Sequence, residues 1–182
     1  PGILLSSAIK RYADYFGVAC GEKNIFFTNN DGAYETAISL IQKGINIEAI
    51  IDNREEINSK LIYEVEKNNI KIFKGYTVTD TSGYKRINRI SIMQLSKDGQ
   101  KVVGSKISLS CDCLGVSGGW TPAVHLFTQS GGKLKFREDD QVFIPNTYTS
   151  DQLSIGSCNG DFTLDEILTN TPISLKKFFN VK

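Results

Sequence analysis

The chain has 182 residues, of which 40% are hydrophobic and 23% charged, so it is long enough for a sizeable core and has the composition of a soluble globular protein. Its formal net charge of +1 gives no electrostatic case for a nucleic-acid or anionic-membrane partner, and no apolar run approaches the ~20 residues of a membrane span. We therefore expect a cytoplasmic protein that has neither kind of partner. The four cysteines lack zinc-binding spacing, so we expect reduced thiols and no metal site.

Helices and strands are predicted to alternate in the first half of the chain. Amphipathic runs predict helices at residues 3–16, 31–43 and 55–68. Short apolar runs predict strands at residues 24–28, 45–51 and 70–78. Such alternation is the repeating unit of a parallel sheet with right-handed crossovers.

The pattern then changes to alternating apolar and polar residues, over 86–95 and 106–116. Asp98-Gly99 between them is a strong hairpin signal. We therefore predict an α/β, Rossmann-like parallel sheet with an antiparallel β-meander inserted at about residues 79–113. This order resembles the second dinucleotide-binding domain of two-domain flavoprotein reductases. We expect one domain over residues 1–182, and the start at Pro1 with a single methionine suggests a segment of a longer protein.

The turn after the first predicted strand lacks the glycines of a phosphate-binding loop. A working turn reads G-x-G-x-x-G/A, because small residues let the backbone approach a pyrophosphate. Thr28, Asn30 and Ala33 stand in those places. We interpret this as a retained fold with a blocked phosphate site. The alternative is a free-standing NAD(P)H-binding reductase domain, in which the Asn29 and Asn30 amides replace backbone N–H groups.

Asp52 ends the second predicted βαβ strand, where a working Rossmann unit places an acid that holds ribose hydroxyls. The competing interpretation is an exposed aspartate that caps the next turn, with Asn53 and Arg54 solvated around it. The missing glycines favour this second interpretation.

Three later features give weaker signals. Gly118-Gly119 is either a turn where two domains meet over a cofactor or a tight turn followed by a core Trp120. His125, the single histidine, lies in a predicted short helix among apolar residues, which favours a structural, hydrogen-bonded role. The glycine-rich stretch 129–133 lacks the spacing of a nucleotide P-loop and is predicted to be a turn. No residue is predicted to be catalytic.

Residues 156–164 form a small-residue turn between a predicted short strand and a helix that continues to Leu168. Backbone N–H groups and the helix dipole favour an anion at such a helix start. The alternative is an ordinary capped strand-to-helix turn.

Four motifs together resemble the alpha subunits of heterotetrameric sarcosine oxidases. They are TNNDGAY at 28–34, VSGGWTPAVHLF at 116–127, QSGGK at 129–133 and GSCNG at 156–160. The Ser-Gly-Gly-Trp…Gly-Gly-Lys run is the most specific, because no generic fold requires its residues. The resemblance implies a central, degenerate dinucleotide-binding domain that acts as a scaffold and as a lid for NAD in a non-redox role. The NAD would be held mainly by an amino-terminal half of the subunit that is absent from this sequence.

The resemblance also implies candidate NAD contacts at Ser157, Phe162 and Leu164, with Gly156 and Gly160 in the same turn. The implied partners are other segments of the alpha subunit and the beta, gamma and delta subunits. FAD, FMN and tetrahydrofolate would belong only to the full complex, an oxidoreductase acting on CH–NH donors with oxygen as acceptor. The segment itself would not be catalytic. The equivalent domain of a related amine or opine dehydrogenase subunit stays open as an alternative.

Overall fold

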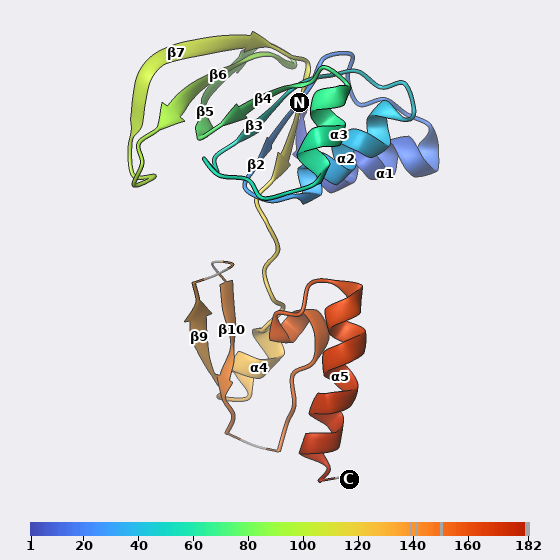
Figure 1. The fold of residues 1–182 in the computed structure, drawn as a ribbon, viewed down its shortest axis with the longest axis vertical. Coiled ribbons are helices and arrows are strands. Elements are labelled where there is room, and N and C mark those ends of the chain that lie inside the picture. Colours follow the sequence, from blue (N-terminus) through green and yellow to red (C-terminus); the bar gives the residue numbers. More distant parts are fainter. Residues whose placement is uncertain (139, 141, 150, 181–182) are drawn as a thin grey trace. The chain divides into compact units, whose positions relative to one another are not determined.

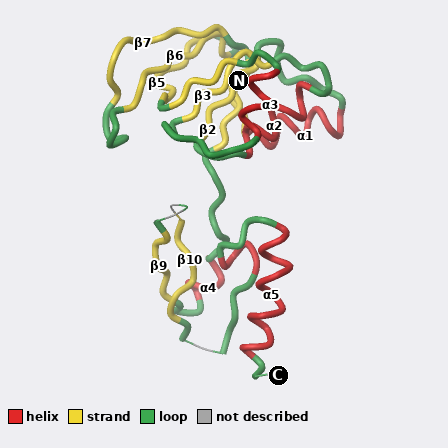
Figure 2. Tube along the Cα trace, in the orientation of Figure 1, coloured by secondary structure: helices red, strands yellow, loops and turns green. Residues whose placement is uncertain are grey.

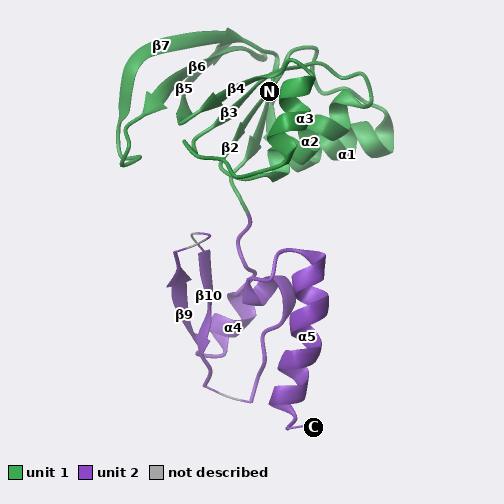
Figure 3. Ribbon diagram, viewed as in Figure 1, with its two compact units in different colours: residues 1–119 green, residues 120–182 purple. Residues whose placement is uncertain are grey.

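The computed structural model describes residues 1–138, 140, 142–149 and 151–180, which form two compact units (Figures 1 and 3). Unit 1 spans Pro1–Gly119, and unit 2 begins at Trp120. The single domain expected over the whole chain stays a prediction.

Unit 1 is built on a five-stranded sheet with strand order β1-β8-β2-β3-β4, and all its neighbouring strands are parallel. Its strands are β1 (Ile3–Leu5), β2 (Asn24–Thr28), β3 (Ile47–Asp52), β4 (Lys71–Lys74) and β8 (Cys113–Ser117). The helices are α1 (Ser6–Phe16), α2 (Gly32–Ile41) and α3 (Leu61–Lys67). A second, antiparallel sheet has the order β5-β6-β7, with strands Tyr76–Gly83, Ile87–Leu95 and Val102–Ser110.

The parallel sheet has a separate hydrophobic core on each face. Successive strand residues point to opposite faces, so Phe26 packs with the helices while Ile25 packs with the antiparallel meander. Both side chains are buried. The helices accordingly lie on one side of the sheet and β5–β7 on the other (Figures 1 and 2). The two covered faces explain why β2 reads as a continuous apolar run. The predicted α/β class with an inserted meander is confirmed.

Several predicted boundaries in unit 1 are wrong. Residues 3–5 extend the parallel sheet by pairing with β8, so the first predicted helix begins only at Ser6. The predicted strand 70–78 breaks at Gly75, whose φ of +71° separates β4 from β5. The predicted strand 106–116 breaks before Cys113 into β7 and β8, and the third helix is shorter than predicted. The meander therefore spans 76–110 rather than about 79–113.

Unit 2 contains an antiparallel hairpin and two α-helices (Figure 3). Its elements are α4 (His125–Gln129), β9 (Lys133–Arg137), β10 (Val142–Thr147), the 3₁₀ turn η1 (Gly156–Asn159) and α5 (Leu164–Phe178). Strand β10 was not predicted, and no strand precedes η1 within the described residues 151–155. Helix α5 runs past Leu168, the predicted end, and continues through Pro172.

Helix α5 has no buried residue, although it carries several large apolar side chains. Its exposed apolar residues include Leu164, Leu168, Ile173, Leu175 and Phe178. Acidic residues in its first turn and lysines in its last turn complement the helix dipole. Within the described part of the chain, no helix is long and apolar enough to cross a membrane.

Candidate functional site

The strand order of unit 1 reverses beside β2, because β8 lies on one side of it and β3 on the other. Ligands of open α/β sheets bind at the carboxyl edge next to such a reversal. Thr28 at the end of β2 is in register with Ser117 on β8 and with Asp52 on β3. These three residues mark the place where a dinucleotide would be expected, and we call it the switch point.

The Asn30 side chain occupies the helix start at the switch point. Its Oδ1 accepts hydrogen bonds from the Gly32 N–H at 2.9 Å and from the Ser117 hydroxyl at 3.1 Å. Its Nδ2 donates to the Ser117 carbonyl at 2.9 Å. Gly32 is the first residue of α2, so its amide is one of the donors that a phosphate at this helix would use.

The rest of the turn is closed by its own side chains. The Thr28 hydroxyl accepts from the Asn30 N–H at 3.0 Å and donates to the Asn30 carbonyl at 2.8 Å. The Asn29 Nδ2 donates to the Gly118 carbonyl at 3.3 Å, and the Asn30 Nδ2 also donates to the Asn29 Oδ1 at 2.9 Å. The free-standing reductase interpretation needs the side-chain amides of Asn29 and Asn30 to bind a cofactor. Both amides already donate hydrogen bonds within unit 1.

Asp52 is completely buried, so the interpretation of an exposed aspartate beside a solvated Arg54 is wrong. Its carboxylate accepts from the Arg54 backbone N–H at 2.9 Å and from the Arg54 Nη2 at 2.8 Å. It also accepts from the Tyr34 hydroxyl at 3.0 Å. The Arg54 Nη1 lies 2.9 Å from Asp31 Oδ1, so one guanidinium joins two carboxylates. We call Asp52, Arg54, Tyr34 and Asp31 the ion-pair network around Asp52.

The charge states of this network follow from its surroundings. Burial, the Asp52 charge and the hydrogen bond to it raise the pKa of Tyr34, so its hydroxyl stays a neutral donor. Burial lowers the pKa of Arg54, but its hydrogen bonds and ion pairs with Asp52 and Asp31 outweigh that effect and raise it overall. The Asp52 carboxylate is thus committed to groups of its own unit rather than held ready for a ribose.

The switch point does not fit a dinucleotide. The Gly32 amide is bonded to Asn30, and the Asp52 carboxylate is bonded to Arg54 and Tyr34. Both groups that would recognise the cofactor are satisfied by side chains of unit 1. This supports the interpretation of a retained fold with a blocked phosphate site.

The double-glycine turn has one clear structural requirement. Gly119 has a φ of +93°, a conformation that L side chains rarely adopt. Trp120 is 70% exposed, so the interpretation of it as a core tryptophan is wrong. Contact of this turn with a cofactor stays a prediction. His125 begins α4 and is exposed, which contradicts the expected packing among apolar neighbours.

The segment 156–164 is placed by η1 and by a capping box at the start of α5. The Thr163 hydroxyl accepts from the Glu166 N–H at 3.2 Å. The Glu166 Oε2 accepts from the N–H groups of Thr163 at 2.9 Å and Phe162 at 3.1 Å. The amides of Phe162, Thr163 and Glu166 are therefore bonded to the side chains of Thr163 and Glu166, as in an ordinary capped strand-to-helix turn.

The predicted NAD contacts of this segment differ in accessibility. Ser157 is exposed, Leu164 is 71% exposed and Phe162 is half-buried. Gly156 and Gly160 are buried, and both have a left-handed φ that shapes the turn. These residues offer an accessible edge, whereas Asp165 and Glu166 make the helix start acidic. Contact of the segment with a nucleotide stays a prediction.

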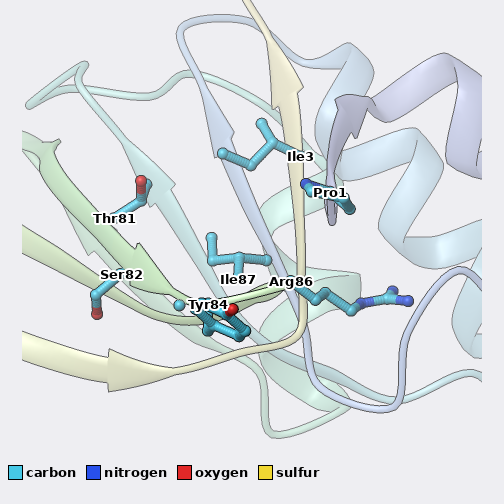
Figure 4. A pocket seen from close by; sticks show the side chains of 8 residues that line it. Pro1, Ile3, Thr81, Ser82, Tyr84, Arg86 and Ile87 are labelled. Atoms are coloured by element: carbon cyan, nitrogen blue, oxygen red, sulfur yellow. The ribbon is translucent and has the colours of Figure 1, made fainter.

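One cavity of unit 1 has a volume of about 180 Å³ (Figure 4). It is lined by Pro1, Ile3, Ile87 and residues 81–84 and 86. Arg86 points away from Thr81 and Ser82 (Figure 4), and its guanidinium donates to the carbonyls of Asp112, at 2.7 Å, and Cys20. The cavity brings together none of the predicted site residues.

Cysteine and metal chemistry gain no support from the described part of the chain. All four cysteines are free. Burial raises the pKa of Cys113 to about 12 and that of Cys111 to about 11, so both thiols are protonated at neutral pH. No cluster of three or more histidine, cysteine, aspartate or glutamate side chains suited to a metal occurs among the described residues.

Several partners of the candidate residues were not predicted from the sequence. Tyr34 and Arg54 were not recognised as partners of Asp52, although Arg54 follows it by two residues. Ser117 was not linked to Asn30, because that contact joins residues 87 positions apart. Arg137, which donates to the Gly160 carbonyl at 2.7 Å, was also missed. Of these contacts, only the one between Asp52 and Arg54 joins residues close enough in the sequence to be expected from their spacing.

Comparison with known proteins agrees with the fold and the motifs. No family model matches the chain. The chain is 29% identical over 160 residues to the sarcosine oxidase subunit alpha of Corynebacterium sp. (strain U-96), a match that covers 88% of this chain. It is 26% identical over 144 residues to the same subunit of Rhizobium meliloti (strain 1021), covering 79% of this chain.

Solved structures show the same fold at low identity. Thioredoxin reductase of T. acidophilum matches 98% of this chain and 57% of its own, with a TM-score of 0.63 and 15% identity. The flavoprotein disulfide reductase RclA of Escherichia coli matches 97% of this chain and 39% of its own, with a TM-score of 0.65 and 14% identity. L-proline dehydrogenase of P. horikoshii matches 99% of this chain and 34% of its own, with a TM-score of 0.55 and 17% identity.

The matched region is a small part of the curated relatives. The chain spans 16% of the Corynebacterium subunit and 13% of the Rhizobium subunit. The resemblance predicted from the motifs is confirmed: the chain is similar to one region of sarcosine oxidase alpha subunits and has the Rossmann-like fold of dinucleotide-binding flavoproteins.

Proposed function

We propose that this chain is a central region of a sarcosine oxidase alpha subunit, in which unit 1 is a closed scaffold and the segment 156–164 lends one edge to NAD. In this proposal most of the NAD is held by an amino-terminal half of the subunit outside this sequence. NAD has a non-redox role there, so the residues of this chain bind and orient rather than transfer hydride. The assembled complex carries out the oxidative demethylation of sarcosine.

One observation carries the scaffold role. The Asn30 carboxamide is bonded both to the first amide of α2 and to Ser117 on the neighbouring strand. A phosphate would have to displace this side chain and break its bonds to β8. These groups are half-buried, and breaking their hydrogen bonds without replacement costs free energy, so the closed turn disfavours nucleotide entry.

The exposed face of α5 supports the proposed partners. Leu164 and Leu168, one helical turn apart, are each more than 60% exposed, and the exposed Leu175 and Phe178 continue the same face. Large apolar side chains gathered on one helix are typical of surfaces that another protein segment covers. Other segments of the alpha subunit, and the beta, gamma and delta subunits, are the partners we propose. FAD, FMN and tetrahydrofolate belong to the rest of that complex.

Titration calorimetry on the 182-residue chain tests the closed scaffold. We expect NAD⁺ and FAD to bind no better than weakly, with dissociation constants above about 1 mM, equivalent to about −4 kcal/mol. Micromolar binding of either nucleotide would overturn the proposal. If micromolar binding were observed, the Asn30→Ala variant would show where the nucleotide binds. Binding through the Asn30 amide would be lost in the variant, whereas binding elsewhere on the chain would remain.

A further inference from the structure

We infer that Arg137 is a positioning residue for the segment 156–164, fixing its backbone and offsetting the carboxylates that an anionic nucleotide would meet there. The inference rests on the proposed function, because it concerns the same edge. It assigns a role to a side chain of the β9–β10 hairpin, which neither the motifs nor the comparisons single out.

The Arg137 guanidinium ties the hairpin to the turn. Its Nη2 donates to the Gly160 carbonyl at 2.7 Å. Its Nε donates to Asp140 Oδ1 at 2.7 Å, and its Nη2 also pairs with Asp140 Oδ2. The two-pronged contact with Asp140 fixes the plane of the guanidinium, so the direction of the bond to Gly160 is fixed as well.

Gly160 packs so closely against the Arg137 side chain that there is no room for a Cβ. A Cβ at this position would lie 2.8 Å from Arg137 Nη2 and 2.8 Å from Ile144 Cγ2. Its φ of +86° is one that residues with a Cβ rarely adopt. Hydrogen bonds from the Gly160 N–H to Ser157 and from the Asp161 N–H to Gly156, each 3.2 Å, complete the turn. The conformation of the segment therefore depends on this contact with the hairpin.

The charges near the turn give Arg137 a second effect. Asp161, Asp165 and Glu166 lie at or just before the start of α5. Hydrogen bonds from Thr163 and Phe162 and the charge of Arg137 lower the pKa of Glu166, so it is ionised at neutral pH. Negative groups repel a diphosphate, and the Arg137 charge interacts with both Asp161 and Glu166. Without Arg137, Asp161 and Glu166 would lose the positive charge that offsets them.

The test compares Arg137→Gln and Arg137→Lys in the full-length gene product with Lys135→Gln as a matched control. Lys135 is an exposed cation on the same strand, so its loss changes the net charge equally. Amide exchange at Gly160 and Asp161 is measured with and without NAD⁺, and NAD⁺ affinity is measured by calorimetry.

We expect Arg137→Gln to speed exchange at Gly160 and Asp161 about tenfold and to weaken NAD⁺ binding about tenfold, as loss of a charged hydrogen bond predicts. Arg137→Lys should restore part of the affinity through its charge, while exchange stays fast because the two-pronged contact is lost. Lys135→Gln should change neither quantity.

Exchange and affinity in Arg137→Gln equal to those of the control would overturn the inference while leaving the proposed function intact. If NAD⁺ gives no protection of residues 156–164 in the unchanged protein, the proposed function fails. The inference then falls with it, whatever the variants show.

Discussion

Removing the Arg54 side chain should destabilise unit 1 more than any exposed charge change. Asp52 is completely buried and receives three hydrogen bonds from the Arg54 side chain, counting both contacts of Nε. Breaking a buried pair by removing one partner costs about 3–5 kcal/mol, because a charge is left buried without its counterion. Arg54→Met should fall at or below the lower end, about 2–3 kcal/mol, since the Arg54 side chain is 30% exposed and the Tyr34 hydroxyl and a backbone amide still bind the carboxylate.

Urea denaturation followed by circular dichroism measures this loss, and the exposed Arg89→Met on β6 is the control. Amide exchange of β2 and β3 reports on unit 1 directly, which matters because two compact units need not unfold together. The double variant Arg54→Met with Asp52→Asn should recover about 1 kcal/mol or more, because it also removes the unpaired charge. An Arg54→Met loss within about 0.5 kcal/mol of the control would refute the reasoning.

Three further changes test separate contacts. Gly115→Ala would place a Cβ 2.4 Å from the Phe26 ring, so it should lower the free energy of unfolding in urea by about 1–3 kcal/mol. Gly118→Ala adds its Cβ in open space and should change that free energy very little. Equal losses in the two variants would contradict the packing around Gly115. Burial raises the pKa of Asp112, but two backbone hydrogen bonds and the charge of Arg86 together outweigh it and lower that pKa below 3.8. Its stabilisation is therefore complete above the unfolded pKa and is lost as pH falls through the folded value. Asp112→Asn should therefore be less stable at pH 7, by a difference that shrinks below pH ~4; a difference independent of pH would count against this. Thr163→Ala should cost about 1 kcal/mol and speed amide exchange at the start of α5; unchanged exchange would contradict the capping box.

The sequence predicted the elements of unit 1 well where local pattern decides them. The apolar run of β2 and the amphipathic face of α2 appear at nearly the predicted residues. Errors occurred where long-range pairing overrides local pattern: residues 3–5 read as helix but pair with β8, more than 100 positions away. Gly75 separates two strands within one apolar run, a break that periodicity alone does not reveal.

The candidate site was predictable only in part, for a similar reason. The missing glycines around Asn30 predicted a phosphate turn that no longer accepts a nucleotide. They did not reveal that Asn30 itself fills the turn by reaching Ser117, or that Asp52 is buried against Tyr34. Those contacts are made in three dimensions between separate elements. They decide whether an acid at a strand end is free to bind a ribose.

A structure of the full-length gene product with NAD⁺ tests the central claim most directly. The account predicts nucleotide density beside Ser157, Phe162 and Leu164, and an unchanged Asn30–Ser117 contact with no density over residues 28–33. Pyrophosphate density over Asn30, with its carboxamide displaced from Gly32, would contradict it.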